Sequence, residues 1–342
     1  MLILGLESSC DDSAAALVTG DRQILAQAVV GQNEAHRPFG GVVPEIAARA
    51  HVEILPDLIR KVLGEAGKGI HEVDAIAATA GPGLIGGVMV ALLAGKGLAM
   101  STGKPLIAVN HLEGHALSPR LVDPDLGFPY LLLLVSGGHC QLLEVRGVGH
   151  YRRLATTIDD AAGEAFDKAA KLLGLPYPGG PAIEELAAEG NPGAVPLPRP
   201  LVGSGEPHFS FAGLKSAVQR AAASAAHRRE DIAASFQQAV VDCLVDRTRL
   251  ALRTSDAPAL VVAGGVAANK AIRAALSELA QAEGRGFTVP PAWLCTDNAA
   301  MIAWAGAERL AQGLTDQLDA PARARWPLDA SAEKVRGAGV KA

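Results

Sequence analysis

The sequence has few aromatic residues, no closely spaced cysteines and no excess of positive charge. Aromatic residues make up 4% of the 342-residue chain, against 38 glycines, a composition that favours helices packed closely on sheets. The four cysteines are widely spaced, which predicts free thiols in a reducing compartment. The net charge of -5 excludes a global basic field, so an RNA substrate would need a local patch or a partner.

Several longer signals are also missing. No run reaches the roughly 18 apolar residues of a membrane span, and residues 2–6 have a strand pattern without the charged flank and cleavage site of a leader. We therefore expect a cytoplasmic protein with no membrane partner. No G-x-x-x-x-G-K-[ST] motif occurs, which excludes a P-loop ATPase. No strand-borne G-x-G-x-x-G with a later acidic residue supports a dinucleotide enzyme.

Hydrophobic patterning predicts an α/β fold in which one architecture occurs twice. Apolar strands at 2–6 and 14–18 flank a polar turn, and 130–135 and 140–145 repeat this pattern. Since the length favours about two domains, we expect a duplicated fold with one phosphate-facing hairpin in each half, the alternative being chance recurrence of glycine hairpins. Further strands are predicted at 73–79, 106–109 and 260–263, helices at 44–64, 88–100, 159–173, 182–189, 213–226, 229–254 and 298–312, and an extended or disordered tail from about 316.

Glycine-rich loops are the main indication of a ligand. Ser136–His139, Gly179–Pro181 and Gly264–Asn269 each place small residues at a turn, where backbone N–H groups can approach an anion. Together with the acidic and hydroxyl-bearing turn Ser8–Ser13, they predict a nucleotide held in a cleft between two similar lobes. Glycines that merely close tight turns would explain each loop taken alone.

Two carboxylates near these loops are candidates for binding a ribose. Asp167 follows the second hairpin, and Glu184 follows the Gly179–Pro181 turn. Carboxylates accept hydrogen bonds from both ribose hydroxyls. The alternative is a solvated helix face on which these groups pair with Lys168 or Lys171.

A histidine pair in the run Asn110–His115 is the main indication of a metal. His111 and His115 are four residues apart, so on a helix both imidazoles project from one face. Asp297, far along the chain, offers a third ligand, although two packed histidines without a metal would fit the spacing equally well. Glu113 does not follow the first histidine directly, so the H-E-x-x-H motif of metallopeptidases is absent.

Eight motifs run almost from end to end of the chain: Glu7–Asp11, Gly81–Leu84, Asn110–His115, Val135–His139, Tyr177–Pro181, Phe209–Lys215, Gly264–Asn269 and Cys295–Ala299. In this order, over residues 1 to about 328, the sequence resembles the bacterial tRNA threonylcarbamoyladenosine transferase family, once described as an O-sialoglycoprotein endopeptidase. That family belongs to the actin and sugar-kinase superfamily.

The resemblance implies a fold and an activity. The fold would be α/β, with two similar actin-like (ASKHA) lobes and a nucleotide and metal cleft between them. The lobes would comprise 1–109 plus about 297–325, and 110–296, followed by a tail at 326–342. The activity would be transfer of the threonylcarbamoyl group from threonylcarbamoyl-AMP to N6 of the adenosine adjacent to the anticodon, A37, forming t6A in tRNAs that read codons starting with A.

The resemblance also implies residue roles. His111, His115 and Asp297 would ligate one Fe(2+) per subunit, with zinc as the alternative metal. The activated substrate would be bound by Val135, Ser136, Gly137, Gly138 and His139, and its adenosine part by Asp167, Gly180, Glu184 and Asn269. No general base is assigned; His139 is a candidate that would equally suit a positioning role. The implied partners are tRNA, a paralogous dimerising subunit (TsaB-like) and an ATPase subunit (TsaE-like).

Departures from the family pattern and competing functions complete the expectations. Asp12 and Ser13 replace the usual Glu-Thr, and Ala48 and Ala50 occupy positions that are usually polar. These alanines put in doubt a role of the predicted helix 44–64 in subunit or RNA contact.

The competing functions are an ATPase or sugar-kinase-like phosphotransferase of the same superfamily, a peptidase, and a nucleotide-binding scaffold. The peptidase is disfavoured by Glu113, and the scaffold by the complete set of loops and ligands.

Overall fold

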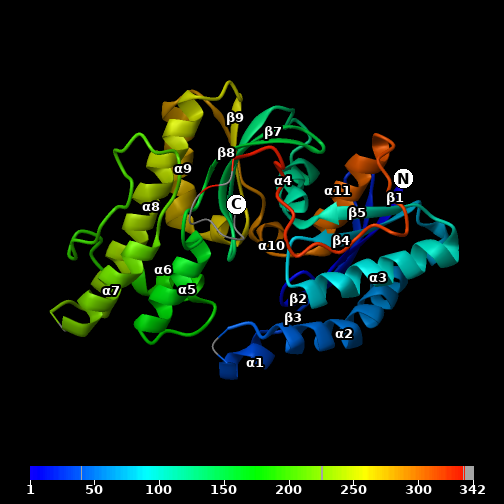
Figure 1. Cartoon of the computed structure of the whole chain (residues 1–342), viewed down its shortest axis with the longest axis horizontal. Helices are drawn as coiled ribbons and strands as arrows, with labels where there is room; N and C mark the ends of the chain where they lie inside the picture. Colours follow the sequence, from blue (N-terminus) through cyan, green and yellow to red (C-terminus); the bar gives the residue numbers. More distant parts are fainter. Residues whose placement is uncertain (40, 225, 334, 336–342) are drawn as a thin grey trace. The chain divides into compact units, whose positions relative to one another are not determined.

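The computed structural model describes residues 1–39, 41–224, 226–333 and 335, and its chain forms two α/β units (Figure 1). The first unit comprises Met1–Leu126 and Thr296–Ala330, and the second is built on Gly127–Cys295. The predicted α/β class is confirmed. Whereas the sequence prediction divided the lobes at residue 110, the helix that carries the histidine pair groups with the first unit. The predicted cleft between the lobes stays a prediction.

The first sheet places its parallel strand ends at one edge. Its order is β3-β2-β1-β4-β5; β1 runs antiparallel to β2, which runs antiparallel to β3, and β1, β4 and β5 are parallel. Every residue of β1, β4 and β5 is buried, because helices cover both faces. The carboxyl ends of parallel strands gather at one edge, where α/β proteins commonly build their sites. The strands are β1 (Leu2–Glu7), β2 (Asp12–Thr19), β3 (Ile24–Gly31), β4 (Ala75–Gly81) and β5 (Leu106–Asn110).

The second sheet repeats this arrangement strand for strand. Its order is β10-β9-β6-β7-β8. Strand β7 runs antiparallel to both β6 and β8, whereas β6, β9 and β10 are parallel. The predicted duplication is therefore confirmed. The sequence analysis missed β3, β8 and β10, which all lie at sheet edges; β3 and β8 are largely exposed or half-buried, and β10 has only 3 residues. The strands are β6 (Tyr130–Val135), β7 (Cys140–Gly147), β8 (His150–Thr156), β9 (Ala259–Ala263) and β10 (Gly286–Thr288).

Helix α11 packs unusually closely on the first sheet. A Cβ at Gly5 would lie 2.3 Å from the carbonyl oxygen of Ala299, and one at Gly306 would lie 2.5 Å from Cβ of Ala77. Side chains larger than hydrogen at these positions would force the helix away from β1 and β4. The helices of this unit are α1 (Asn33–His36), η1 (Arg37–Phe39), α2 (Pro44–Glu65), η2 (Ile70–Glu72), α3 (Ile85–Thr102), α4 (His111–Val122) and α11 (Ala299–Ala311).

Helices of the second unit enclose an aromatic and aliphatic core. Phe166 of α5 and Phe236 of α8 meet edge to face at 5.2 Å between ring centroids, and both are buried. Helix α6 begins at Gly179, three residues before its predicted start. The helices of this unit are α5 (Ala162–Leu172), α6 (Gly179–Ala187), α7 (Ala212–Ser224), α8 (Arg229–Arg253), η3 (Gly265–Ala268), α9 (Lys270–Ala282) and α10 (Ala292–Cys295).

The predicted tail is extended where the structure describes it. The backbone N–H of Asp316 donates to the Leu106 carbonyl at 2.8 Å, and that of Arg323 donates to the Ala80 carbonyl at 2.8 Å. The amide of Asn110 donates to the carbonyl of Trp326 at 2.9 Å. The segment thus lies along the ends of β4 and β5, whereas 334 and 336–342 lie outside the described residues.

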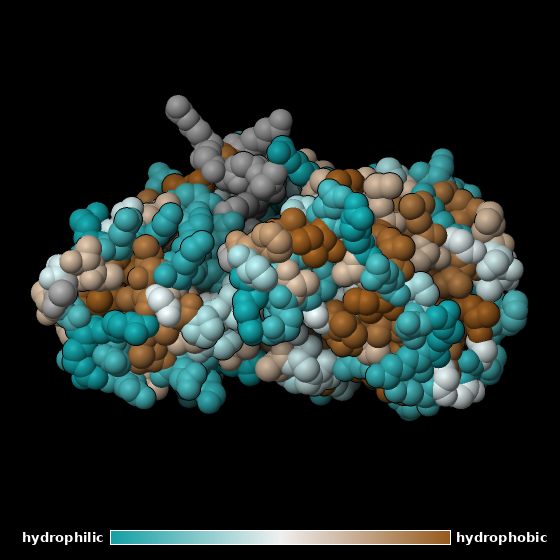
Figure 2. Space-filling model, turned by 90° about the horizontal axis from the view of Figure 1, so that it is seen from below, coloured by the Kyte–Doolittle hydropathy of each residue, from teal (hydrophilic) through white to brown (hydrophobic). Residues whose placement is uncertain are grey.

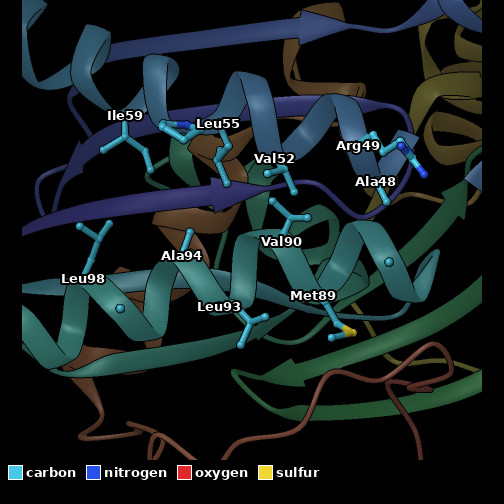
Figure 3. A pocket seen from close by; sticks show the side chains of 13 residues that line it. Ala48, Arg49, Val52, Leu55, Ile59, Met89, Val90, Leu93, Ala94 and Leu98 are labelled. Atoms are coloured by element: carbon cyan, nitrogen blue, oxygen red, sulfur yellow. The ribbon is translucent and has the colours of Figure 1, made fainter. Parts of the chain in front are cut away.

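An apolar groove lies between α2 and α3. It has a volume of about 780 Å³, and Val52 and Leu55 of α2 point toward Val90 and Ala94 of α3 (Figure 3). Leu93 is 54% exposed beside it. Figure 2, drawn from the side of these helices, shows apolar patches among polar side chains. Among the described residues, α3 alone has the length and composition to cross a membrane, a test that core helices also pass.

Candidate active site

Helix α4 presents the histidine pair as the spacing predicts. The helix begins directly after β5 because the side chain of Asn110 caps it, accepting the backbone N–H of Leu112 at 2.9 Å. His111 and His115 then follow one turn apart, with ring centroids 4.8 Å apart and the rings perpendicular. His115 is fully buried and His111 is 8% exposed.

The start of α11 brings Asp297 to this pair. The side chain of Asn298 caps α11 by accepting the N–H of Met301 at 2.9 Å, so Asp297 immediately precedes the helix. The missing side chain at Gly5 lets the first turn of α11 lie against β1, as described above. Packing of α11 on β1, almost 300 residues away in sequence, therefore fixes the position of this carboxylate.

The structure brings the three predicted metal ligands together. Oδ1 of Asp297 lies 3.1 Å from Nε2 of His115 and 3.5 Å from Nε2 of His111, and the three ligand atoms all lie within 4.8 Å of one another. Glu113, on another face of α4, instead forms an ion pair with Arg309 at 3.1 Å. This placement is unlike that of a metallopeptidase general base.

Glu7, at the end of β1, is a site residue that the sequence analysis did not identify. Its Oε2 accepts the hydroxyl of Thr79 at 2.6 Å and lies 2.9 Å from Nδ1 of His111. Its Oε1 accepts the backbone N–H of Ser9 at 2.5 Å. The available signal was an acidic residue ending a buried strand, but its partner on β5–α4 becomes visible only once β1, β4 and β5 are aligned.

Charge complementarity dominates this cluster. Burial opposes ionisation of Glu7, but the charge and hydrogen bond of His111 outweigh it and lower the pKa of Glu7. Burial likewise opposes the charge of His111, yet Asp297 and Glu7 raise its pKa well above the ordinary value. Burial would raise the pKa of Asp297, but His111 and then His115 hold it well below its usual range.

The donor set fits a divalent metal ion. Two imidazole nitrogens and one carboxylate oxygen converge, a set that suits Fe(2+) or Zn(2+) with positions left for other ligands. The Asp297 side chain is 25% exposed, so the cluster is reachable from solvent. Buried Nδ1 of His115 has no hydrogen-bond partner among the described residues. The contact between Nε2 and Asp297 is therefore the polar contact of this ring that metal binding at Nε2 would replace.

Asp12 adds a group that exchanges protons near neutral pH. Burial, and then the charges of Asp297 and Asp11, raise its pKa to about 7. A carboxyl group with such a pKa is suited to general acid or base chemistry. The sequence analysis recorded Asp12 only as a departure from the family pattern, because the pKa depends on distant Asp297.

The other departures lie on α2 and its contacts. Ser13 Oγ lies 2.7 Å from Nδ1 of His51, whose Nε2 lies 3.1 Å from the carbonyl oxygen of Cys10. The Ser13 hydroxyl thus contacts His51 of α2 from the start of β2. Ala48 lines the apolar groove.

In the second unit, the loop between β6 and β7 is tightly closed. The N–H of Ser136 donates to the carbonyl of His139 at 2.8 Å, and the N–H of His139 donates to Oγ of Ser136 at 3.2 Å. Gly264 (φ 95°) lies against the loop, because a Cβ there would lie 2.4 Å from the carbonyl oxygen of Val135. Gly163 approaches from α5 and donates its N–H to the carbonyl of Ser136 at 3.3 Å.

The tip of this loop is open for a ligand. Gly137 and Gly138 are exposed, and a Cβ at either residue would meet no atom within 4 Å. Backbone at such a position can approach an anion closely, as the sequence analysis expected. His139 is partly buried beside it.

The two candidate ribose carboxylates both accept backbone N–H groups at helix starts. Asp167 accepts from Gly179 at the start of α6 at 2.8 Å, and Gly180 beside it has open space at its Cα. Glu184 accepts from Lys270 at the start of α9 at 2.8 Å. Lys168, one of the alternative partners, pairs with Asp160 at 2.5 Å.

Asn269 shares the start of α9 with Glu184. Its Oδ1 accepts the N–H of Ile272 at 3.0 Å, and its amide nitrogen donates to Gln237 at 2.9 Å. The predicted substrate residues thus lie in the second unit, where Asp167 and Glu184, within α5 and α6, accept N–H groups from the starts of α6 and α9, and the predicted metal ligands lie in the first. The binding roles themselves stay predictions.

Comparison with known proteins identifies close, full-length relatives. The family model of TsaD, tRNA N6-adenosine threonylcarbamoyltransferase, matches residues 23–304. A protein of that name from Sphingopyxis alaskensis is 75% identical, covering 100% of this chain and 99% of its own. Those from Novosphingobium aromaticivorans and Zymomonas mobilis are 69% and 65% identical, covering 100% of this chain and 99% and 95% of theirs.

Solved structures of low sequence identity share the fold. HypF of T. kodakarensis aligns with a TM-score of 0.61 and 16% identity, over 91% of this chain and 48% of that chain. Component A of the Acidaminococcus fermentans (R)-2-hydroxyglutaryl-CoA dehydratase aligns with a TM-score of 0.56 and 18% identity, over 91% of this chain and 99% of that chain. These likenesses support the actin-like fold alone. The family match and the full-length relatives show that the chain belongs to the tRNA N6-adenosine threonylcarbamoyltransferase family.

Proposed function

We propose that this chain transfers the threonylcarbamoyl group from threonylcarbamoyl-AMP to N6 of adenosine 37 in tRNAs that read codons starting with A, forming t6A. The observation that carries the proposal is the 75% identity, over the full chain, to a protein named for this activity. The convergence of His111, His115 and Asp297 supports it independently, because a phosphotransferase of the same fold would not need two histidines and a carboxylate around one point.

The chemistry explains why an activated donor is required. The N6 amine is conjugated with the purine ring and is a poor nucleophile, whereas a mixed anhydride with AMP provides a good leaving group. We propose that His111, His115 and Asp297 hold one Fe(2+), with zinc as the alternative. Such an ion would polarise donor oxygens as a Lewis acid and orient the donor.

The other predicted site residues would contribute to the transfer. The exposed backbone of Gly137 and Gly138 would donate hydrogen bonds to developing negative charge on the donor. Asp167, Glu184 and neighbouring backbone would bind the adenosine part. His139 is the candidate for accepting the proton that N6 loses, and the carboxylate of Asp12 is the second candidate.

We infer a cytoplasmic enzyme that works with partner proteins. The net charge of -5 leaves tRNA binding to local surface or partners. The groove between α2 and α3 would receive helices of a paralogous dimerising subunit, because exposed Val52 and Leu93 offer apolar surface that a packed helix pair would bury. An ATPase subunit would complete the system.

Reconstitution tests the proposed transfer. The purified chain and its partners would be incubated with threonine, bicarbonate, ATP, the adenylate-forming synthase and unmodified tRNA, and the nucleosides analysed by mass spectrometry. We expect t6A. ATP hydrolysis or ATP-dependent sugar phosphorylation by the purified chain alone, with no t6A from the complete mixture, would support the kinase alternative instead.

Metal content tests the proposed ligands separately. In His111→Ala and His115→Ala, bound metal and transfer should both fall to background. Full metal loading with normal transfer in either variant would exclude the ligand assignment, even if t6A formation by the wild-type chain is confirmed.

A further inference from the structure

The two histidines of the cluster differ in how their second ring nitrogen is bound. Nδ1 of His111 lies 2.9 Å from Oε2 of Glu7 and 3.1 Å from Oγ of Ser9. Nδ1 of His115 is buried and has no hydrogen-bond partner among the described residues. At this second nitrogen His115 therefore has no polar contact among the described residues, whereas Glu7 and Ser9 both lie within hydrogen-bond distance of His111.

Glu7 is itself rigidly anchored. It is fully buried at the end of β1, and three donors fix both of its oxygens: the hydroxyl of Thr79 on β4, the backbone N–H of Ser9 and the imidazole of His111. The strand end, the neighbouring parallel strand and the following turn thus determine where this carboxylate lies. A carboxylate accepts hydrogen bonds only, so it selects the His111 tautomer with a proton on Nδ1.

We propose that Glu7 is a positioning residue of the metal centre, which holds His111 by Nδ1 so that the lone pair of Nε2 faces Asp297. A carboxylate behind a ligand histidine fixes the ring and increases its basicity. It also supplies a second buried negative charge, so that Glu7 and Asp297 together balance a divalent cation. This proposal rests on the proposed function, in particular on the metal site.

Removing the carboxylate tests this role. In Glu7→Gln the amide has nearly the same shape as the carboxylate but no charge. Its NH₂ group would face at least one of the three hydrogen-bond donors around Glu7, and that hydrogen bond would be lost. We expect metal affinity to fall about 10- to 100-fold, the range seen when such partners of ligand histidines are lost. The measurement is titration of the full-length chain with Co(2+) and Zn(2+), following the visible Co(2+) spectrum and competition with a chromophoric chelator.

Glu113→Gln provides a matched control. Glu113 is also a buried carboxylate, 2% exposed, but it pairs with Arg309 on a different face of α4. The Glu113→Gln variant therefore removes a buried negative charge from α4 itself, at a residue whose ion pair is with Arg309. Its metal affinity should stay within about twofold of the wild-type value, within the scatter that context produces.

A spectroscopic measurement on the wild-type chain separates orientation from general destabilisation. In the Zn(2+)-loaded chain, ¹⁵N-resolved NMR should show one imidazole Nδ1 proton that is shifted downfield and exchanges slowly, as a hydrogen bond to a buried carboxylate requires. It should be absent in Glu7→Gln and present in Glu113→Gln. This readout does not depend on enzyme activity and remains available if Glu7→Gln fails to fold.

The outcomes separate this inference from the proposed function. If the wild-type chain binds metal, two results would overturn the role of Glu7 alone. One is an equal loss of metal affinity in Glu7→Gln and Glu113→Gln, and the other is no loss of affinity in Glu7→Gln. Absence of the Nδ1 resonance in the loaded wild-type chain would do the same. A wild-type chain that binds no metal would overturn the metal site and the role of Glu7 together.

Discussion

At the residue scale, the site is defined by charges that are buried together. His111 lies between the carboxylates of Glu7 and Asp297, and each carboxylate keeps its charge because of that imidazole. The sequence indicated His111 and Asp297 through type and spacing. It did not indicate Glu7, since a strand-end carboxylate has no partner until the strands are aligned.

Metal binding should release a proton. Because the pKa of His111 is raised well above its ordinary value, the metal-free chain still carries the imidazole proton at neutral pH. A metal must displace it from Nε2, so affinity should weaken as pH falls, with about one proton released per ion near neutrality. Calorimetric titration in buffers of different ionisation enthalpy measures this number. Release of no proton at pH 7 would contradict the raised pKa of His111 in the metal-free chain.

Asp12→Asn should stabilise the metal-free chain at high pH. The pKa of Asp12 is about 7 in the fold against 3.8 ordinarily, so its folded state loses stability as pH rises between these values. The neutral amide removes that cost, which is at most about 4 kcal/mol. Thermal unfolding with chelator present should therefore show a higher Tm for the variant at pH 8 and no gain below pH 4. Equal Tm values at pH 8 would contradict the shifted pKa.

At the element scale, close packing of α11 on β1 positions Asp297. Periodicity predicted both elements, and the low aromatic content predicted close packing in general. That Gly5 is the contact point could not be predicted, because it depends on which helix returns to the first sheet from the far end of the chain. The edge strands β3, β8 and β10 were missed because their residues are largely exposed or half-buried and give only a weak hydrophobic pattern.

Gly5→Ala should weaken both stability and the metal site. The added methyl group would lie 2.3 Å from backbone of Ala299, so α11 must shift, which costs about 1–3 kcal/mol. Asp297 precedes that helix and would move with it, so metal affinity should fall in parallel. Denaturant unfolding and metal titration measure the two effects.

Gly97→Ala is the control for this substitution. Gly97 lies within exposed α3, and a Cβ there would meet nothing within 4 Å. The change should stabilise the chain by about 1 kcal/mol through helix propensity and leave metal affinity unchanged. If Gly5→Ala retained wild-type affinity while losing stability, the close approach of α11 would not be what positions Asp297.

At the scale of the whole molecule, the two sheets show that the chain contains one architecture twice. The repeated hairpins at 2–18 and 130–145 made this predictable, because each half carries the same strand pattern around a polar turn. The grouping of α4 with the first unit was not predictable from pattern, since it depends on contacts with α11. The predicted metal ligands and the glycine loops lie at or near strand ends and helix starts, whereas Asp167 and Glu184 lie within α5 and α6.

The α2–α3 groove should be required for assembly but not for metal binding. Leu93 is 54% exposed at the groove, so Leu93→Asp should leave the isolated fold intact while placing a charge in the apolar interface. We expect loss of co-elution with the paralogous subunit and normal metal content. Arg37→Asp, on exposed η1 outside the groove, is the control. Unchanged assembly of Leu93→Asp would place the interface elsewhere.

The central claim is that the His–His–Asp site serves threonylcarbamoyl transfer. Its most direct test measures t6A formed on unmodified tRNA by the reconstituted enzyme after the chain is stripped with a chelator and then reloaded. We predict product with the loaded chain, loss after stripping, and recovery on adding back Fe(2+) or Zn(2+) in the wild-type chain but not in Asp297→Ala. Equal t6A formation by the stripped and loaded chains would contradict the claim.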